Sequence, residues 1–296
     1  MRRKTKILGM IAHVLFLTGF FSSAPGQVAD PLKVTVSILP QKYFIQKIGG
    51  DLLDVSVMVL RGASPATYEP RPQQMVAVTQ SKIYFAIGVP FEKVWLRKFA
   101  KVNPEMTIIH TEDGIEKMPM KGHRHEGEGA QDPGIKDPHV WLSPPLVMVQ
   151  ARNILDALLK VDPAHGQTYE RNYKSFVGEL VDLDLEIRSI LSREGEGRKF
   201  MVYHPSWGYF AKSYGLKQIP IEAEGKAPTP KELESLIQFA KEEGVKVIFV
   251  QPQFSTKSAN TIAHSLGGQV MFADPLALDW AGNLLKVAEK FRAASR

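Results

Sequence analysis

The feature that most constrains the fold is an alternation of short β-rich runs with helical stretches, which occurs in both halves of the chain. In the first half, strands are expected at 33–39, 54–60, 82–88 and 106–110, with helices at 41–50, 71–81 and 91–102. In the second half, strands are expected at 199–204, 216–221, 245–250 and 269–274, with helices at 205–215, 229–244, 256–266 and from about 279. Strand and helix in turn are typical of a parallel sheet covered by helices. We therefore predict an α/β fold of two lobes, each a mainly parallel sheet flanked by helices.

A long helix is predicted between the two halves. Asp162 is a good N-cap, Pro163 suits the first helical position, and Gly195 and Gly197 end the pattern. Apolar residues recur at spacings of four and three and form one stripe, at Tyr169, Tyr173, Phe176, Leu180, Leu183, Ile187 and Ile190. About 30 residues at 1.5 Å each give roughly 45 Å, enough to run along both lobes. A coiled-coil dimer is the alternative reading of the stripe, but a single helix between α/β units favours packing on its own lobes and a monomer.

The predicted domains follow from this pattern: an N-terminal lobe over 30–160, a linking helix over 161–196 and a C-terminal lobe over 197–296. The first 29 residues belong to neither lobe. A basic start, Met1–Lys6, precedes an apolar run from Ile7 to Phe21 and a small-residue stretch, SSAPGQVAD. This order is typical of a cleaved export signal, which predicts a periplasmic protein. An uncleaved anchor is the alternative, although the run is shorter than the roughly 20 residues of a membrane span.

Composition excludes several classes of protein. The chain has no cysteine, which rules out disulfides and a lipid-modified cysteine. The formal net charge of +6 falls to +2 when Arg2, Arg3, Lys4 and Lys6 leave with the signal. No basic patch with interleaved aromatics is present, so nucleic-acid binding is not expected.

The segment DPHVWLSPP (137–145) places one histidine in an unusually stiff setting. Its three prolines fix φ and restrict the residues that precede them. The segment is either a rigid lead-in to a following helix or a support that aims the imidazole of His139.

Two further candidate ligands stand where predicted strands end. His204 follows KFMVY and Asp274 closes QVMFAD, and open α/β sheets bind ligands beyond the carboxyl ends of their strands. Two imidazoles and a carboxylate would form a ligand set for zinc. The alternative is purely structural, since each residue precedes a proline and could serve as a helix cap.

Several motifs together resemble a known family. They are GASPATYEPRPQQ (62–74), DPHVWLSP (137–144), HPSWGYFAKSYGL (204–216), QPQFS (251–255) and DPLA (274–277). They look like the zinc- and manganese-binding solute-binding proteins of ABC transporters, the ZnuA/TroA type, along essentially the whole mature chain. The resemblance implies that two lobes joined by a long helix hold one divalent metal ion between them and deliver it to a membrane permease. It also implies that His139, His204 and Asp274 are metal ligands. A histidine at 204 favours Zn²⁺ over Mn²⁺, because imidazole suits zinc and oxygen ligands suit manganese.

One position departs from the family pattern. The first ligand histidine of the family would fall at Ala66, which cannot bind metal. The gap could be filled by water or by one of five side chains, namely Glu69, Glu222, Glu224, His123 or His125. The site could also have lost tight metal binding.

The remaining histidines and aromatics are interpreted as structural. His110, His165 and His264 are expected in strands, helices or at the surface, and the loop 120–136 is expected to be solvated, with an accessory metal contact as its alternative. Trp141, Trp207 and Tyr209 are expected to pack around the site.

The leading functional prediction is therefore a non-enzymatic, metal-capturing component of an ABC import system. A binding protein for another solute, with a degenerate metal site, is the first alternative. A metal-dependent hydrolase is the second, because three ligands and a water can activate that water.

Overall fold

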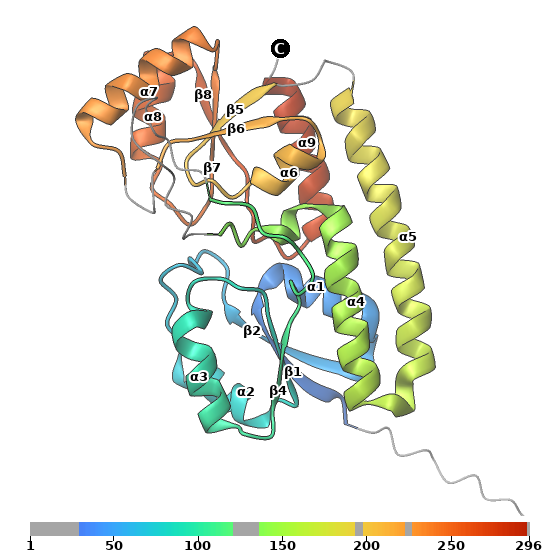
Figure 1. Cartoon of the computed structure of the whole chain (residues 1–296). Helices are drawn as coiled ribbons and strands as arrows, with labels where there is room; N and C mark the ends of the chain where they lie inside the picture. Colours follow the sequence, from blue (N-terminus) through green and yellow to red (C-terminus); the bar gives the residue numbers. More distant parts are fainter. Residues whose placement is uncertain (1–29, 121–135, 193–197, 223–226, 295–296) are drawn as a thin grey trace, which may run out of the picture. The chain divides into compact units, whose positions relative to one another are not determined.

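The computed structural model describes residues 30–120, 136–192, 198–222 and 227–294. Contacts group Pro31–Arg296 into one compact unit (Figure 1). The predicted signal over 1–29 lies outside the described residues.

The first sheet contains four parallel strands in the order β2-β1-β3-β4. Its strands are β1 (Leu32–Ile38), β2 (Leu53–Val59), β3 (Ile83–Ala86) and β4 (Thr107–His110). Its helices are α1 (Leu39–Gly49), α2 (Pro72–Gln80) and α3 (Glu92–Val102), with a 3₁₀ turn at Gly50–Leu52. Val34 pairs with Val55 on one side and Ile83 on the other, so β1 is central and its last five residues are buried. Both faces of the strand are covered: Val34, Val36 and Ile38 alternate with Thr35 and Ser37, whose buried hydroxyls are hydrogen-bonded.

The second sheet repeats this topology in the order β6-β5-β7-β8, again all parallel. Its strands are β5 (Lys199–Val202), β6 (Lys217–Pro220), β7 (Val247–Val250) and β8 (Gln269–Phe272). Its helices are α6 (Gly208–Ser213), α7 (Pro230–Glu242), α8 (Lys257–Ser265) and α9 (Trp280–Ala294). In each sheet the strand order reverses between two neighbouring strands, β1 and β3 or β5 and β7. Ligands bind at such reversal points, beyond the carboxyl ends of the strands.

Two long helices connect the sheets: α4 (Pro144–Val161) and α5 (Gly166–Leu191), which run side by side in Figure 1. The residue pattern gave no bounds for α4, which follows the stiff 137–145 segment. The helical segment starts at Pro163 as predicted, but its first turn, Pro163–His165, is 3₁₀ and runs directly into α5, which begins at Gly166. The carboxylate of Asp162 accepts from His165 Nδ1 and the Tyr169 hydroxyl rather than capping the helix backbone.

The apolar stripe of α5 packs within the chain. The helix contacts α1 and α4 from the N-terminal half of the chain and α9 from the C-terminal half. Its residues Tyr169, Phe176 and Ile187 are fully buried. The apolar stripe is therefore buried against helices of the same chain. The lobe boundaries at 160 and 196 remain predictions.

A cluster of buried aromatics joins the two halves. The Trp280 ring lies 4.9 Å from that of Phe44, edge to face. Trp280 Nε1 donates to the carbonyl of Trp141 at 2.8 Å, and Trp141 Nε1 donates to the carbonyl of Pro275 at 2.7 Å. These buried bonds fix the loop before α4 against the segment before α9. Within the described residues, no helix has the length and apolarity that a bilayer span requires.

Candidate metal centre

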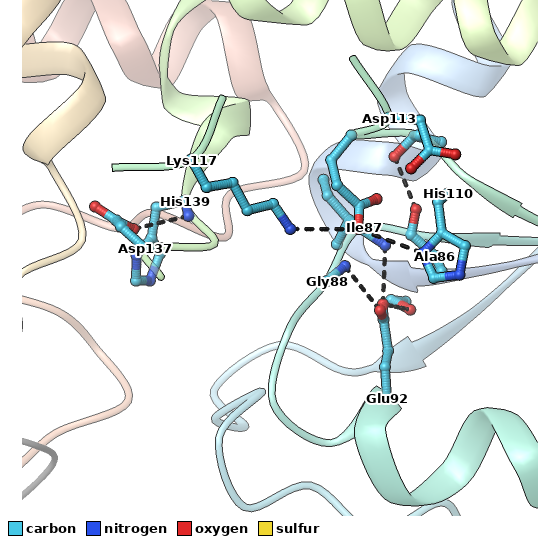
Figure 2. Close-up of polar contacts among 12 residues, drawn as sticks. Ala86, Ile87, Gly88, Glu92, His110, Asp113, Lys117, Asp137 and His139 are labelled. Carbon is cyan, nitrogen blue, oxygen red and sulfur yellow. Dashed lines mark hydrogen bonds and ion pairs between the residues drawn. The ribbon is translucent and has the colours of Figure 1, made fainter. Parts of the chain in front are cut away.

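The loop before α4 holds His139 in one orientation. Val140–Leu142 form a 3₁₀ turn, and His139 is only 7% exposed. Asp137 Oδ1 accepts from the backbone N–H of His139 at 2.9 Å and from its Nδ1 at 2.7 Å (Figure 2). Because a carboxylate only accepts, Nδ1 carries the proton and Nε2 keeps its lone pair. The Tyr209 hydroxyl, which donates to the carbonyl of Asp137 at 3.0 Å, ties the loop to α6.

His204 is held in the same manner from the second sheet. It lies two residues beyond β5, at the reversal point of that sheet. Its Nδ1 donates to the buried carboxylate of Glu222. Gln251, just beyond β7, accepts from the N–H of His204 at 3.1 Å and donates to its carbonyl at 2.6 Å. Phe254 stacks on the ring with centroids 5.0 Å apart. The second imidazole therefore also keeps a free Nε2.

The two imidazoles meet at one cavity. Their ring centroids are 5.2 Å apart at an interplanar angle of 71°, although 65 positions separate them in sequence. Both line a cavity of about 620 Å³. Two histidines with carboxylates on Nδ1 are the arrangement found around protein-bound zinc, where the outer carboxylate fixes the tautomer and raises the basicity of the ligand nitrogen.

Burial favours the metal-binding form of His139. It lowers the pKa of the imidazole below its ordinary value, while the Asp137 carboxylate acts in the opposite direction. Desolvation disfavours the imidazolium because the charged form loses the most hydration. His139 is therefore neutral at neutral pH and able to donate a lone pair.

Asp274 stands at the edge of this arrangement. Its Oδ1 accepts from Gln253 Nε2 at 3.1 Å and from the N–H of Leu276 at 2.9 Å. Both hydrogen-bond partners, Gln253 and Leu276, line the cavity. Among the described residues, no group of three or more His, Cys, Asp or Glu side chains is arranged to hold a metal ion. The structure thus brings His139 and His204 together, whereas Asp274 is not among the lining residues although its two partners are.

The candidate replacements for Ala66 have different surroundings. Ala66 itself lines the cavity, whereas Glu69 is exposed and does not. Glu222 is occupied with Nδ1 of His204. Glu224, His123 and His125 lie outside the described residues.

Other residues of the cavity were not singled out by the sequence. Asp137 could have been found, since it stands two residues before His139 in the same stiff motif. His110, interpreted as structural, ends β4 and lines the cavity, as do Lys93, Lys117 and Lys136. No sequence pattern links these lysines, because they come from separate segments. The expected packing role of Trp141, Trp207 and Tyr209 agrees with their burial at 1%, 0% and 3% exposure.

A buried carboxylate occupies the reversal point of the first sheet, on the wall of the same cavity. Glu92 accepts from the N–H groups of Ile87 at 3.0 Å and Gly88 at 2.7 Å, and from the Ser37 hydroxyl (Figure 2). Gly88 has φ +81°, a left-handed backbone conformation in which any other side chain would be strained. Burial raises the pKa of Glu92 to about 7, and the three hydrogen bonds oppose that rise.

We expect Glu92 to make folding stability fall with rising pH. The unfolded chain loses this proton near pH 4.5 and the folded chain near pH 7, so stability declines between those values and stays lower above them. This difference in pKa corresponds to about 3 kcal/mol of unfolding free energy. Urea unfolding at pH 4.5 and pH 8 should show a smaller pH dependence for Glu92→Gln than for the unchanged protein. Glu116→Gln, at an exposed site, is the control, and equal pH dependence in both variants would contradict the assignment.

Comparison with known proteins adds a family match over nearly the whole described chain. The family described as "Zinc-uptake complex component A periplasmic" matches residues 34–293. A Bacillus subtilis high-affinity zinc uptake system protein, ZnuA, is 31% identical over 247 residues, covering 81% of this chain and 77% of that protein. The iron-binding protein YfeA of Yersinia pestis is 29% identical over 260 residues, covering 86% and 81%.

A solved structure shares the fold. The crystal structure of a ZnuA deletion mutant with zinc bound superposes with a TM-score of 0.83 at 45% identity, covering 90% of this chain and 98% of that one.

Proposed function

Because this chain belongs to the family of periplasmic A components of zinc-uptake complexes, we propose that it captures a zinc ion and delivers it to the membrane permease of an ABC importer. The metal is the cargo of the protein. The observation that carries the proposal is the pair of imidazoles at 139 and 204, each oriented by a carboxylate and both facing one cavity.

The proposed ligands are Nε2 of His139, Nε2 of His204 and a carboxylate oxygen of Asp274. Asp274 Oδ1 is engaged by Gln253 and Leu276, so Oδ2 is the oxygen offered to the metal. Bringing it to the ion requires a shift of the segment before α9 relative to the two histidines. Such a shift is a small closure on binding, limited by the Trp141–Pro275 and Trp280–Trp141 bonds.

The choice of zinc rests on ligand chemistry and on relatives. Imidazole nitrogens suit zinc, whereas oxygen-rich sets suit manganese. The relatives include a zinc-uptake protein and an iron-binding protein, so iron is the competing cargo. A zinc titration against a chelator of known affinity, with Fe²⁺ and Mn²⁺ in parallel, tests the proposal. It fails if zinc binds no more tightly than manganese.

We infer that Ala66 stands where relatives carry a further ligand histidine. Ala66 lines the same cavity as His139 and His204, which supports this placement. The chain then supplies three ligands, and a tetrahedral zinc needs a fourth.

Further proposals concern the export, location and oligomeric state of the protein. We propose that residues 1–29 are a cleaved export signal, that the mature chain is a periplasmic monomer, and that it neither binds nucleic acid nor catalyses a reaction. The matched relatives are described as uptake or metal-binding proteins, which favours binding over catalysis. Hydrolase assays with and without zinc should show no turnover.

We expect Glu222→Gln to weaken zinc binding by about 10- to 100-fold, the usual cost of removing an outer partner of a ligand histidine. The neutral amide no longer raises the basicity of Nε2 as the carboxylate does, and where its NH₂ faces Nδ1 of His204 the ring proton moves onto Nε2, the atom that must bind metal. Competition titration measures the effect.

Glu69→Gln is the matched control for this substitution. Glu69 is exposed and is not among the cavity-lining residues, so the affinity of the Glu69→Gln variant for zinc should be unchanged. If the loss were larger for Glu69→Gln than for Glu222→Gln, Glu69 would be the ligand and the positioning role of Glu222 would be wrong.

A further inference from the structure

We propose that the cavity receives zinc together with a small polycarboxylate chelator, whose oxygens complete the coordination of the ion. This inference rests on the proposed zinc capture and extends it from a bare ion to a ternary complex. Three observations carry it: the charge of the lining, the volume of the cavity and the shortage of protein ligands.

The lining is cationic, which is unfavourable for a bare dication. Lys93, Lys117 and Lys136 all border the cavity. Lys117 Nζ lies 3.3 Å from Glu112 Oε1, but neither Lys93 nor Lys136 forms an ion pair within the described part of the chain. Glu92 is the only carboxylate among the described lining residues, and hydrogen bonds from Ser37, Ile87 and Gly88 already engage it. The Asp137 and Glu222 carboxylates lie behind the two imidazoles and are engaged by their Nδ1 atoms. The lysine-bearing wall therefore attracts an anion, while the two imidazoles stay available to the metal.

The volume is that of a small-molecule site. Pockets for small organic ligands measure about 300–1,000 Å³, and this cavity of about 620 Å³ lies in the middle of that range. A zinc ion held at about 2.0–2.1 Å from imidazole nitrogens uses only a small part of it. The two histidines and the lysines share the cavity, so one carboxylate of a chelator can bind the metal while another meets a lysine.

The protein leaves coordination positions open. No group of three His, Cys, Asp or Glu side chains is poised for a metal among the residues that the structure describes. Ala66 contributes only a methyl group to the wall. Citrate illustrates the fit: its three carboxylates and Zn²⁺ give a complex of charge −1, which matches the lysines and supplies the missing oxygens.

Equilibrium dialysis of the full chain with radiolabelled citrate and radiolabelled zinc tests the proposal. We expect about one citrate per chain when zinc is present and none when zinc is absent. Zinc retained without citrate, in the mixture that contains both, would overturn this inference and leave zinc capture intact. Citrate retained equally without zinc would show a metal-independent anion site and also overturn it. Zinc retained under no condition would overturn the proposed function itself.

Paired variants identify the residues involved. Lys93→Met with Lys136→Met should lower zinc-dependent citrate retention about tenfold, since two exposed ion pairs of roughly 0.5–1 kcal/mol each are lost. Lys101→Met with Lys160→Met removes two exposed lysines outside the cavity lining and should change nothing. Ala66→His should raise the retention of zinc alone and reduce that of citrate, because the new imidazole takes the position of the chelator oxygen. Equal citrate retention in both lysine pairs would contradict the assigned contacts.

Discussion

His139→Ala and His204→Ala each lower zinc affinity by about 100-fold or more in a competition titration, because losing a ligand costs more than the 10- to 100-fold of losing its outer partner. Each substitution removes one of the two nitrogens that the structure brings together at the cavity. Because His139 is also buried beside Trp141, urea unfolding of both variants separates lost binding from lost folding.

His110→Ala is the control for this pair. His110 lines the same cavity, but its Nδ1 faces Glu112, and it ends β4 of the first sheet whereas His204 follows β5 of the second. Its zinc affinity should match that of the unchanged protein. Full affinity in both His139→Ala and His204→Ala would contradict the site.

Trp280→Ala should cost about 4 kcal/mol of unfolding free energy, within the 3–5 kcal/mol found for deleting a buried large aromatic. Trp280 is 1% exposed, packs against Phe44 and donates to the carbonyl of Trp141. The substitution leaves a cavity at the joint between the halves and removes the donor of a buried hydrogen bond. The urea midpoint should fall at an unchanged slope.

Leu278→Ala is the matched control, two residues away. Leu278 is 48% exposed, and surface substitutions of this kind change stability by no more than about 0.5 kcal/mol. A loss below about 1 kcal/mol in Trp280→Ala would show that the joint relaxes around the deletion and that this cluster does not hold the halves together.

The alternation of strands and helices was sufficient to predict both sheets. All eight predicted strands exist, with each boundary displaced by no more than two residues, and the two errors that matter for the site lie at the carboxyl ends of β5 and β8. Tyr203 and His204 were expected to continue β5, but the strand ends at Val202 because the chain turns there to place His204 at the cavity. Likewise β8 ends at Phe272, two residues before Asp274. The candidate ligands His204 and Asp274 thus lie two residues beyond the ends of their strands, and hydrophobic periodicity does not predict where a strand ends.

The candidate site could be predicted only in part. His139 and His204 are recognisable from a stiff motif and a strand end, but their proximity, with ring centroids 5.2 Å apart, is a result of the tertiary fold that no local pattern predicts. The partner of His204 could not be foreseen as such, because Glu222 lies 18 residues away beyond another strand. The cationic lining could not be foreseen either, since its lysines belong to a helix and two loop segments that only the tertiary fold brings to one cavity.

X-ray absorption of the zinc-loaded chain, together with anomalous scattering from its crystals, tests the central claim most directly. The account predicts one zinc per chain, bound by Nε2 of His139 and Nε2 of His204 at about 2.0–2.1 Å, with an oxygen of Asp274 at about 2.0–2.2 Å. Zinc bound without nitrogen neighbours, or an anomalous peak away from both imidazoles, would contradict it.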